Sequence, residues 1–279
     1  MSKGVERYEA DIVDRFRGYE KAGKGQVIEL CQIQVGDRQL SFVAFRTGGD
    51  MVVTARHHVN EFFGTTETVM RLAQSGQEGF TLVPVVDVAY YGESQERRER
   101  IMQGGSLCSD VHDLFFGYKD GPPSNAKNDW ADYKYTQSDP PPAIAAIKTL
   151  IDDCLVVVDL HNSATSAPFF LTVPTLSSDE IGIFELVTRQ MMDRGESVQS
   201  YQTSAICGRQ LVNGVYEYRG RPHTIINYAR TAGVMNLGFE IPVFDPSVGQ
   251  GKWPQLRNIE DSADVTSGVI IALARSVNR

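Results

Sequence analysis

The sequence lacks the features that would place it in a membrane or on a nucleic acid. It has no run of 18 apolar residues, so we expect no membrane-spanning helix. The opening segment, MSKGVERYEADIVDRF, lacks the apolar core of a signal peptide. Basic residues are in deficit, with 27 Lys and Arg against 35 Asp and Glu and a net charge of −8. Because a nucleic-acid surface needs concentrated positive charge, we expect neither a nucleic-acid nor a membrane partner.

Paired cysteine motifs and phosphate loops are missing as well. Four cysteines, at positions 31, 108, 154 and 207, include no Cys-x-x-Cys pair. Cys31 and Cys154 lie in apolar runs, which is typical of reduced, partly buried thiols in a cytoplasmic protein. The absence of a glycine-rich loop disfavours a nucleotide-binding protein.

An alternation of strand-like and helix-like segments is present instead. We expect strands over 26–49 (a hairpin around GDR), 50–58, 80–88, 154–161, 168–174 and 234–244. We expect helices over 5–20, 60–76, 141–153, 177–195 and 262–278, the fourth opened by a Ser177–Glu180 capping box. This order predicts one α/β domain over residues 1–279, with a mixed, mostly parallel twisted sheet and helices on both faces.

Two stretches interrupt this alternation. Residues 113–142 are aromatic, polar and proline-rich, and residues 199–230 are rich in Tyr and Arg. Long loops in a compact domain usually carry function, so we expect both to line a site; plain insertions are the alternative.

Candidate metal ligands lie at the ends of two expected strands. His57 and His58 follow one apolar run, Glu61 comes three residues after His58, and His161 ends another run. Zinc favours a small set of His and carboxylate ligands, and open α/β sheets place their sites at the carboxyl ends of strands. A His-x-x-Glu pair alone is a weak signal, because strand-end histidines are more often structural. A further carboxylate, Glu240, lies within an apolar strand, where it needs a partner or a function; an ion pair with an arginine is the alternative.

Three segments, in this order, resemble the zinc carboxypeptidase A-like family and its deacylase relatives, the succinylglutamate desuccinylases and aspartoacylases. "HVNEFFG" is similar to the relatives' H-G-N-E-x-x-G, with Val59 in place of Gly. "DLHNSA" looks like the segment with the third ligand, and "LGFEIP" like the segment with the catalytic glutamate. The resemblance implies one zinc ion per chain on His58, Glu61 and His161, with His57 as a neighbour.

The resemblance also implies the catalytic groups. Glu240 corresponds to the carboxylate that takes a proton from water and passes it to the leaving nitrogen. Arg100 corresponds to the family's oxyanion-stabilising arginine, although Arg97 and Arg98 are close and a solvated basic helix face is the alternative.

The same resemblance also assigns substrate-binding residues, by their spacing along the chain. Tyr218 corresponds to the tyrosine that closes over substrate, with Tyr216 and Tyr228 nearby. Ile225 or Ile226 would form the base of an apolar pocket, and a plain core role is equally compatible.

The family's carboxylate clamp is altered in this sequence. The clamp is an Asn-Arg pair, and the matching stretch, "CSDVHDLFFG", has His112 and Asp113 at these positions. An aspartate cannot hold a carboxylate by charge-assisted hydrogen bonds. Either an arginine at 219, 221 or 230 replaces the clamp, or the substrate presents a cationic or neutral group.

The sequence therefore predicts a zinc-dependent hydrolase of an amide or peptide bond, carboxypeptidase-like but with an altered clamp. The substrate would be a peptide or small molecule, and a homo-oligomer is compatible with the sequence. The first alternative is an N-acyl deacylase or esterase with the same zinc chemistry. The second is a catalytically silent binding domain, which the intact ligand set and Glu240 disfavour.

Overall fold

The computed structural model describes residues 6–56, 61, 63–88, 91, 92, 95, 96, 98, 99, 138–163, 165–173, 176–198, 207–219, 224–245 and 256–277. Their strands form one nine-stranded sheet in the order β1-β2-β4-β3-β5-β9-β6-β8-β7. The strands are β1 (Gln26–Val35), β2 (Arg38–Arg46), β3 (Met51–Ala55), β4 (Phe80–Val83), β5 (Val156–Ser163), β6 (Phe169–Thr172), β7 (Cys207–Val212), β8 (Val215–Tyr218) and β9 (Met235–Pro242).

The centre of the sheet is parallel and its flanks are largely antiparallel. Strands β4, β3, β5 and β9 pair in parallel, whereas β1 with β2, β2 with β4, β6 with β9, and β7 with β8 are antiparallel. Parallel strands in the middle of a sheet are buried on both faces, which explains the unbroken apolar runs in β3 and β5. The parallel centre brings the carboxyl ends of β3, β5 and β9 to one edge.

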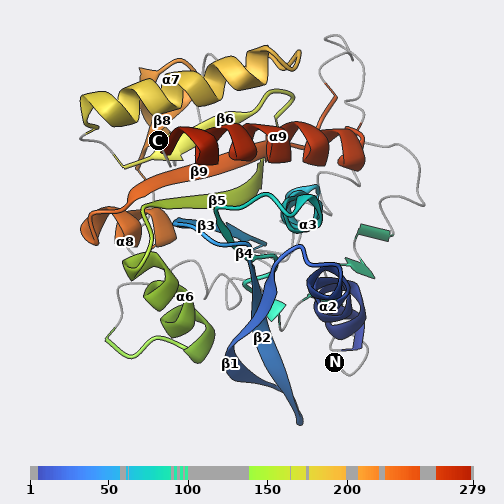
Figure 1. Ribbon diagram of the computed structural model, residues 1–279. Helices are drawn as coiled ribbons and strands as arrows, with labels where there is room; N and C mark the ends of the chain where they lie inside the picture. The colour runs from blue at the N-terminus through green and yellow to red at the C-terminus, as the bar shows by residue number, and fades with distance from the viewer. Residues whose placement is uncertain are drawn as a thin grey trace, which may run out of the picture.

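Helices cover both faces of the sheet (Figure 1). Helices α3 (Thr65–Ser75), α7 (Ser178–Met192) and α9 (Ile259–Val277) lie on one face, and α6 (Pro142–Asp152) and α8 (Ile225–Thr231) on the other. The π-helical turn η1 (Glu9–Val13) continues into α2 (Asp14–Lys21), which lies near β1 and α3. None of the described helices is long and apolar enough to cross a membrane.

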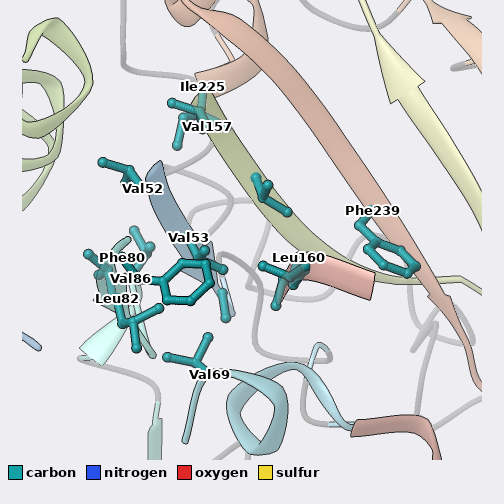
Figure 2. Packing of buried hydrophobic residues seen from close by; sticks show 14 of the residues in the cluster. Val52, Val53, Val69, Phe80, Leu82, Val86, Val157, Leu160, Ile225 and Phe239 are labelled. Carbon is teal, nitrogen blue, oxygen red and sulfur yellow. The ribbon is translucent and has the colours of Figure 1, made fainter. Parts of the chain in front are cut away.

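Alternate residues of the central strands pack against the two helical layers. Figure 2 shows Val52, Val157 and Ile225 of α8 gathered on one side, and Val53 and Val69 of α3 on the other. Val157 and His161 have the same parity in β5, so the side chain of His161 belongs to the face that α8 covers.

Several local predictions are confirmed. The GDR hairpin forms between β1 and β2, and α6 begins at Pro142. The capping box at the start of α7 is present, with Ser177 accepting from the Glu180 backbone N–H and Glu180 accepting from the Ser177 N–H. Both signals are local, so the sequence alone specifies them.

Other elements differ from prediction. Helix α3 begins at Thr65 instead of residue 60, because Gly64 takes a left-handed conformation (φ 83°) immediately before it. Strand β4 ends at Val83, before Pro84, which has no N–H to continue the ladder. The stretch 199–230, expected as a loop, contains β7, β8 and α8. The stretch 113–142 is described only from residue 138.

Candidate metal centre

The candidate centre lies where β5 and β9 end side by side. Their parallel register pairs Asp159 with Gly238 and His161 with Glu240. Because side chains alternate between faces, these four positions share one face, and neighbouring strands lie about 4.8 Å apart. Glu240 is 6% exposed. The register thus brings His161 and the predicted catalytic carboxylate to adjacent places at one edge of the sheet.

Glu61 reaches the same point from the segment that follows β3. Its Oε1 lies 2.5 Å from His161 Nδ1, although the two residues are 100 positions apart. The segment is attached to β5 by Asn162, which accepts a hydrogen bond from the Phe63 N–H (2.9 Å) and donates one to the Phe63 carbonyl (2.8 Å). The Thr65 hydroxyl also donates to the Glu61 carbonyl at 2.6 Å. These backbone contacts fix the position from which Glu61 projects.

The other nitrogen of His161 faces a second carboxylate. Asp159 Oδ2 lies 2.6 Å from His161 Nε2, and Asp159 Oδ1 accepts a hydrogen bond of 2.7 Å from the Thr54 hydroxyl. Burial by itself lowers the pKa of His161, but the charges and hydrogen bonds of Asp159 and Glu61 raise this pKa well above its usual value. The ring is therefore held between two carboxylates.

The contact between Glu61 and His161 is compatible with two ligands of one zinc ion. Ligand atoms at about 2.0–2.2 Å from tetrahedral zinc lie roughly 3.3 Å apart, so the Glu61–His161 contact of 2.5 Å needs to open by less than about 1 Å. Within the described residues, no group of three or more His, Cys, Asp and Glu side chains could hold one metal ion. Asp159 cannot act as a third ligand beside Glu61, because the two carboxylates face opposite nitrogens of the ring. The third ligand of a zinc site would come from another segment, and His58 is the candidate from the sequence.

Several predicted site residues lie outside the described residues. They are His58, Arg100, His112 and Asp113, together with His57 and Arg97.

Of the arginines considered beside Arg100, Arg98 is described and forms an ion pair with Glu67 of α3. This pair lines a cavity of about 440 Å³ between η1, α3 and the segment at 91–99, which is distinct from the His161 edge.

Tyr218 lies at a distance from Glu240 in the sheet. Strand β6 lies between them: Phe169 pairs with Glu240, and Phe170 pairs with Val215. Tyr218 follows three residues after Val215, in the direction of the amino end of β9. At about 3.3 Å per residue, it is displaced from Glu240 by roughly 13 Å along the strands, two strands away.

Arg219 and Arg230 are the described arginines that could replace the family's clamp, and both contact glutamates of their own. Arg230 pairs with Glu180 at 2.9 Å and donates to the Val173 carbonyl, next to the amino end of β9. Arg219 lies 3.4 Å from Glu217. Ile225 and Ile226 are buried in the core beneath the sheet.

Two site residues were not predicted from the sequence. Asp159 is detectable in principle, because an Asp-x-His spacing within a strand places both side chains on one face. Asn162 carries no such signal, because its role depends on the close approach of the Phe63 backbone.

Comparisons with known proteins support the fold. No protein-family model and no curated protein matches the sequence. Among solved structures, the metallo-carboxypeptidase from Pseudomonas aeruginosa has a TM-score of 0.59 and 16% identity, covering 97% of this chain and 68% of that chain. Bovine thrombin-activatable fibrinolysis inhibitor gives 0.57 and 12%, covering 96% of each chain. Carboxypeptidase A from Helicoverpa armigera gives 0.55 and 14%, covering 94% of this chain and 71% of that chain.

The chain therefore has the metallo-carboxypeptidase fold. This confirms the predicted fold class, and it confirms the resemblance to the zinc carboxypeptidases at the level of the fold.

Proposed function

We propose that this protein is a zinc-dependent hydrolase that cleaves an amide or peptide bond. The observation that carries the proposal is the contact between Glu61 and His161 beside Glu240, at the carboxyl edge of a carboxypeptidase fold. Buried carboxylates and imidazoles gathered at one point are expensive unless they serve a ligand or a reaction.

Each residue has a chemical role in this proposal. His58, Glu61 and His161 would hold zinc, which lowers the pKa of water and polarises a carbonyl when it is bound. Glu240 takes the proton of the attacking water and delivers it to the leaving nitrogen. Arg100 remains the candidate donor to the oxyanion.

The substrate class follows from Asp113. An aspartate at the position of the family's clamp arginine repels a terminal carboxylate in a partly desolvated site. We therefore propose that the group bound near His112 and Asp113 is cationic or a neutral hydrogen-bond donor. The engagement of Arg230 supports this, because its pair with Glu180 and its bond to the Val173 carbonyl hold it beside the amino end of β9.

An N-acyl deacylase is the second candidate. The altered clamp bears on both candidates alike, because the deacylase relatives share the Asn-Arg pair and Asp113 would repel the carboxylate of an N-acyl amino acid as it would that of a peptide. The two activities share the zinc chemistry and differ in the bond presented to it.

One experiment tests the function and separates the candidates. The zinc-loaded protein is incubated with peptides and N-acyl amino acids, and the products are identified by mass, with Glu240→Gln as the control. We expect cleavage by the wild type and cleavage slower by about 10²–10⁴-fold in the variant. Equal cleavage by both proteins, or no cleavage of any substrate, would contradict the proposal.

The clamp is tested with one good substrate whose terminal group is a carboxylate, an amide or an amine. We expect the carboxylate form to be the poorest, and Asp113→Ala to reduce this difference. A strong preference for the carboxylate that Asp113→Ala leaves unchanged would rule out the proposed role of Asp113.

A further inference from the structure

Three helical segments turn charged faces toward one another around the cavity of about 440 Å³. Its lining includes positions 7, 11 and 15 of the first helical segment, 66, 67, 70, 71 and 74 of α3, and 91, 95, 98 and 99 further along the chain. Within each segment these positions recur three or four residues apart, so they lie on one face of a helix. Helices that face one another usually bury apolar stripes between them. A polar space of this size therefore holds either water or a ligand.

Positive and negative charges are balanced on the walls of this cavity. The guanidinium groups that line it are those of Arg7, Arg15, Arg71 and Arg98. The carboxylates that line it are those of Asp11, Glu67, Glu99 and Glu260. A simple anion or cation would meet as many like charges as opposite ones. The lining therefore favours a zwitterion, which presents a charge of each sign.

Two inaccessible atoms of opposite character have no hydrogen-bond partner among the described residues. They are Oε2 of Glu67, which is an acceptor, and Nε of Arg71, which is a donor. Both residues belong to the face of α3 that lines the cavity, and residues four apart in a helix have Cβ atoms about 5–6 Å apart. An α-amino acid carries an ammonium group and a carboxylate on one carbon atom. It thus supplies a donor for Glu67 and an acceptor for Arg71, the two partners that these atoms lack.

An apolar surface lies beside the charged groups. Ile12 and Met70 line the cavity and are 1% and 2% exposed. The ring of Tyr91 completes this surface, and its orientation is fixed because its hydroxyl donates to Asp11 (3.1 Å) and accepts from Gln95 (2.7 Å). An aliphatic side chain would therefore meet a preformed apolar wall.

We propose that this cavity binds a free α-amino acid with an aliphatic side chain, with its ammonium group on Glu67 and its carboxylate between Arg71 and Arg15. Arg15 is exposed at the rim, and its guanidinium contacts the Tyr19 hydroxyl at 3.2 Å but pairs with no carboxylate of the described residues. The inference goes beyond the proposed function and does not depend on zinc, because none of the lining residues named above is a candidate metal ligand.

Binding of L-leucine is measured by isothermal titration calorimetry in the zinc-loaded protein, and again after zinc is removed with a chelator. We expect equal affinity in the two forms. Two analogues are titrated into the metal-free protein, so that they are not hydrolysed. N-acetyl-L-leucine lacks the ammonium charge and L-leucinamide lacks the carboxylate. Each should bind about tenfold more weakly or less, because one charge-assisted hydrogen bond is lost.

Variants of the lining residues test the two charged contacts. Glu67→Gln should weaken the binding of L-leucine by about 10–100-fold, because a charge-assisted contact at an inaccessible atom is lost. Arg15→Gln should weaken it by only about two- to fivefold, because an exposed ion pair contributes little.

Two exposed residues outside the cavity supply matched controls, Glu185→Gln on α7 and Arg17→Gln on α2. They make the same changes of charge, and both should bind L-leucine like the wild type. The comparison of Arg15→Gln with Arg17→Gln keeps the test decisive even if Glu67→Gln does not fold.

The outcomes separate this inference from the proposed function. An absence of binding at about 10 mM L-leucine, where a Kd of about 1 mM would be detected, would show that the cavity holds water only and would overturn the inference. Analogues that bind as tightly as L-leucine, or wild-type affinity in Glu67→Gln or Arg15→Gln, would also overturn it. Loss of binding on removal of zinc would place the ligand at the candidate metal centre instead. Binding with the expected pattern in a protein that hydrolyses no substrate would overturn the function and leave the inference supported.

Discussion

The two ends of β5 each carry a side chain of a type that binds zinc in other proteins, but the surroundings of the two side chains differ. Cys154 lies just before the amino end and His161 near the carboxyl end. Burial, together with the nearby Asp50 and Asp152, raises the pKa of Cys154 to about 12, and its Sγ lies 3.5 Å from the Val156 carbonyl. His161 instead lies between Asp159 and Glu61.

The comparison shows that nearby carboxylates have opposite effects on a thiol and on an imidazole as metal ligands. Carboxylates near a thiol disfavour the thiolate, which is the form that binds metal. Carboxylates near an imidazole hold its ring in one orientation and increase its basicity, which favours metal binding. The amino end of β5 is therefore a packing element, and the carboxyl end is the candidate centre.

The largest expected effect comes from His161→Ala. Without this ligand, zinc content should fall from about one ion per chain to background, and hydrolysis should disappear. Elemental analysis after gel filtration measures the content. His57→Ala should retain zinc, and the reverse pattern of the two variants would overturn the ligand assignment.

Glu240→Gln should act on turnover alone. The amide has the shape of the carboxylate but cannot take a proton, so we expect kcat to fall by about 10²–10⁴-fold with zinc retained. Steady-state kinetics beside zinc analysis measures both quantities. Near-normal turnover would mean that another group is the base.

Leu160→Ala tests whether the two faces of β5 act independently. Leu160 is fully buried on the face opposite His161. Its truncation should lower the free energy of unfolding by about 2–5 kcal/mol, measured by urea denaturation. Zinc affinity of the folded protein should not change, and a loss of about tenfold or more would show that the faces are coupled.

The smallest effect is expected at the amino end. Cys154→Ala should leave zinc content and turnover unchanged and reduce stability by only about 1 kcal/mol. In the wild type, a pKa of about 12 leaves roughly one thiol in ten thousand ionised at pH 8, so iodoacetamide should label Cys154 slowly in the folded protein. Rapid labelling of Cys154, or loss of zinc from Cys154→Ala, would show that the amino end of β5 is not merely a packing element.

The parts that the sequence predicted are those with local causes. The Ser177–Glu180 box, the β1–β2 hairpin and the apolar runs of β3, β5 and β9 depend on neighbouring residues, and all are present. The β7–β8 hairpin also had a local signal, the Asn213–Gly214 turn between two short strands, which the composition of the surrounding stretch obscured.

The parts that the sequence could not supply depend on strand register. Spacing along the chain suggested Tyr218 as a substrate residue, but spacing does not determine how β8 aligns with β6. The contact between Asp159 and Thr54 likewise requires that β3 lie beside β5 in one particular alignment. The candidate metal ligands were suggested by resemblance, and the described contact of Glu61 with His161 is a consequence of topology.

The position of β9 has a consequence for how the chain acquires its structure during synthesis. This strand lies between β5 and β6 in the sheet, yet it follows β1 to β8 along the chain. Without β9, the strand order would leave two separate parts, β1-β2-β4-β3-β5 and β6-β8-β7, with the facing edges of β5 and β6 unpaired. Such edges pair readily with other chains. Pairing of β9 with both parts covers these edges and brings Glu240 beside His161, so the strand that protects the sheet from pairing with other chains also completes the candidate site.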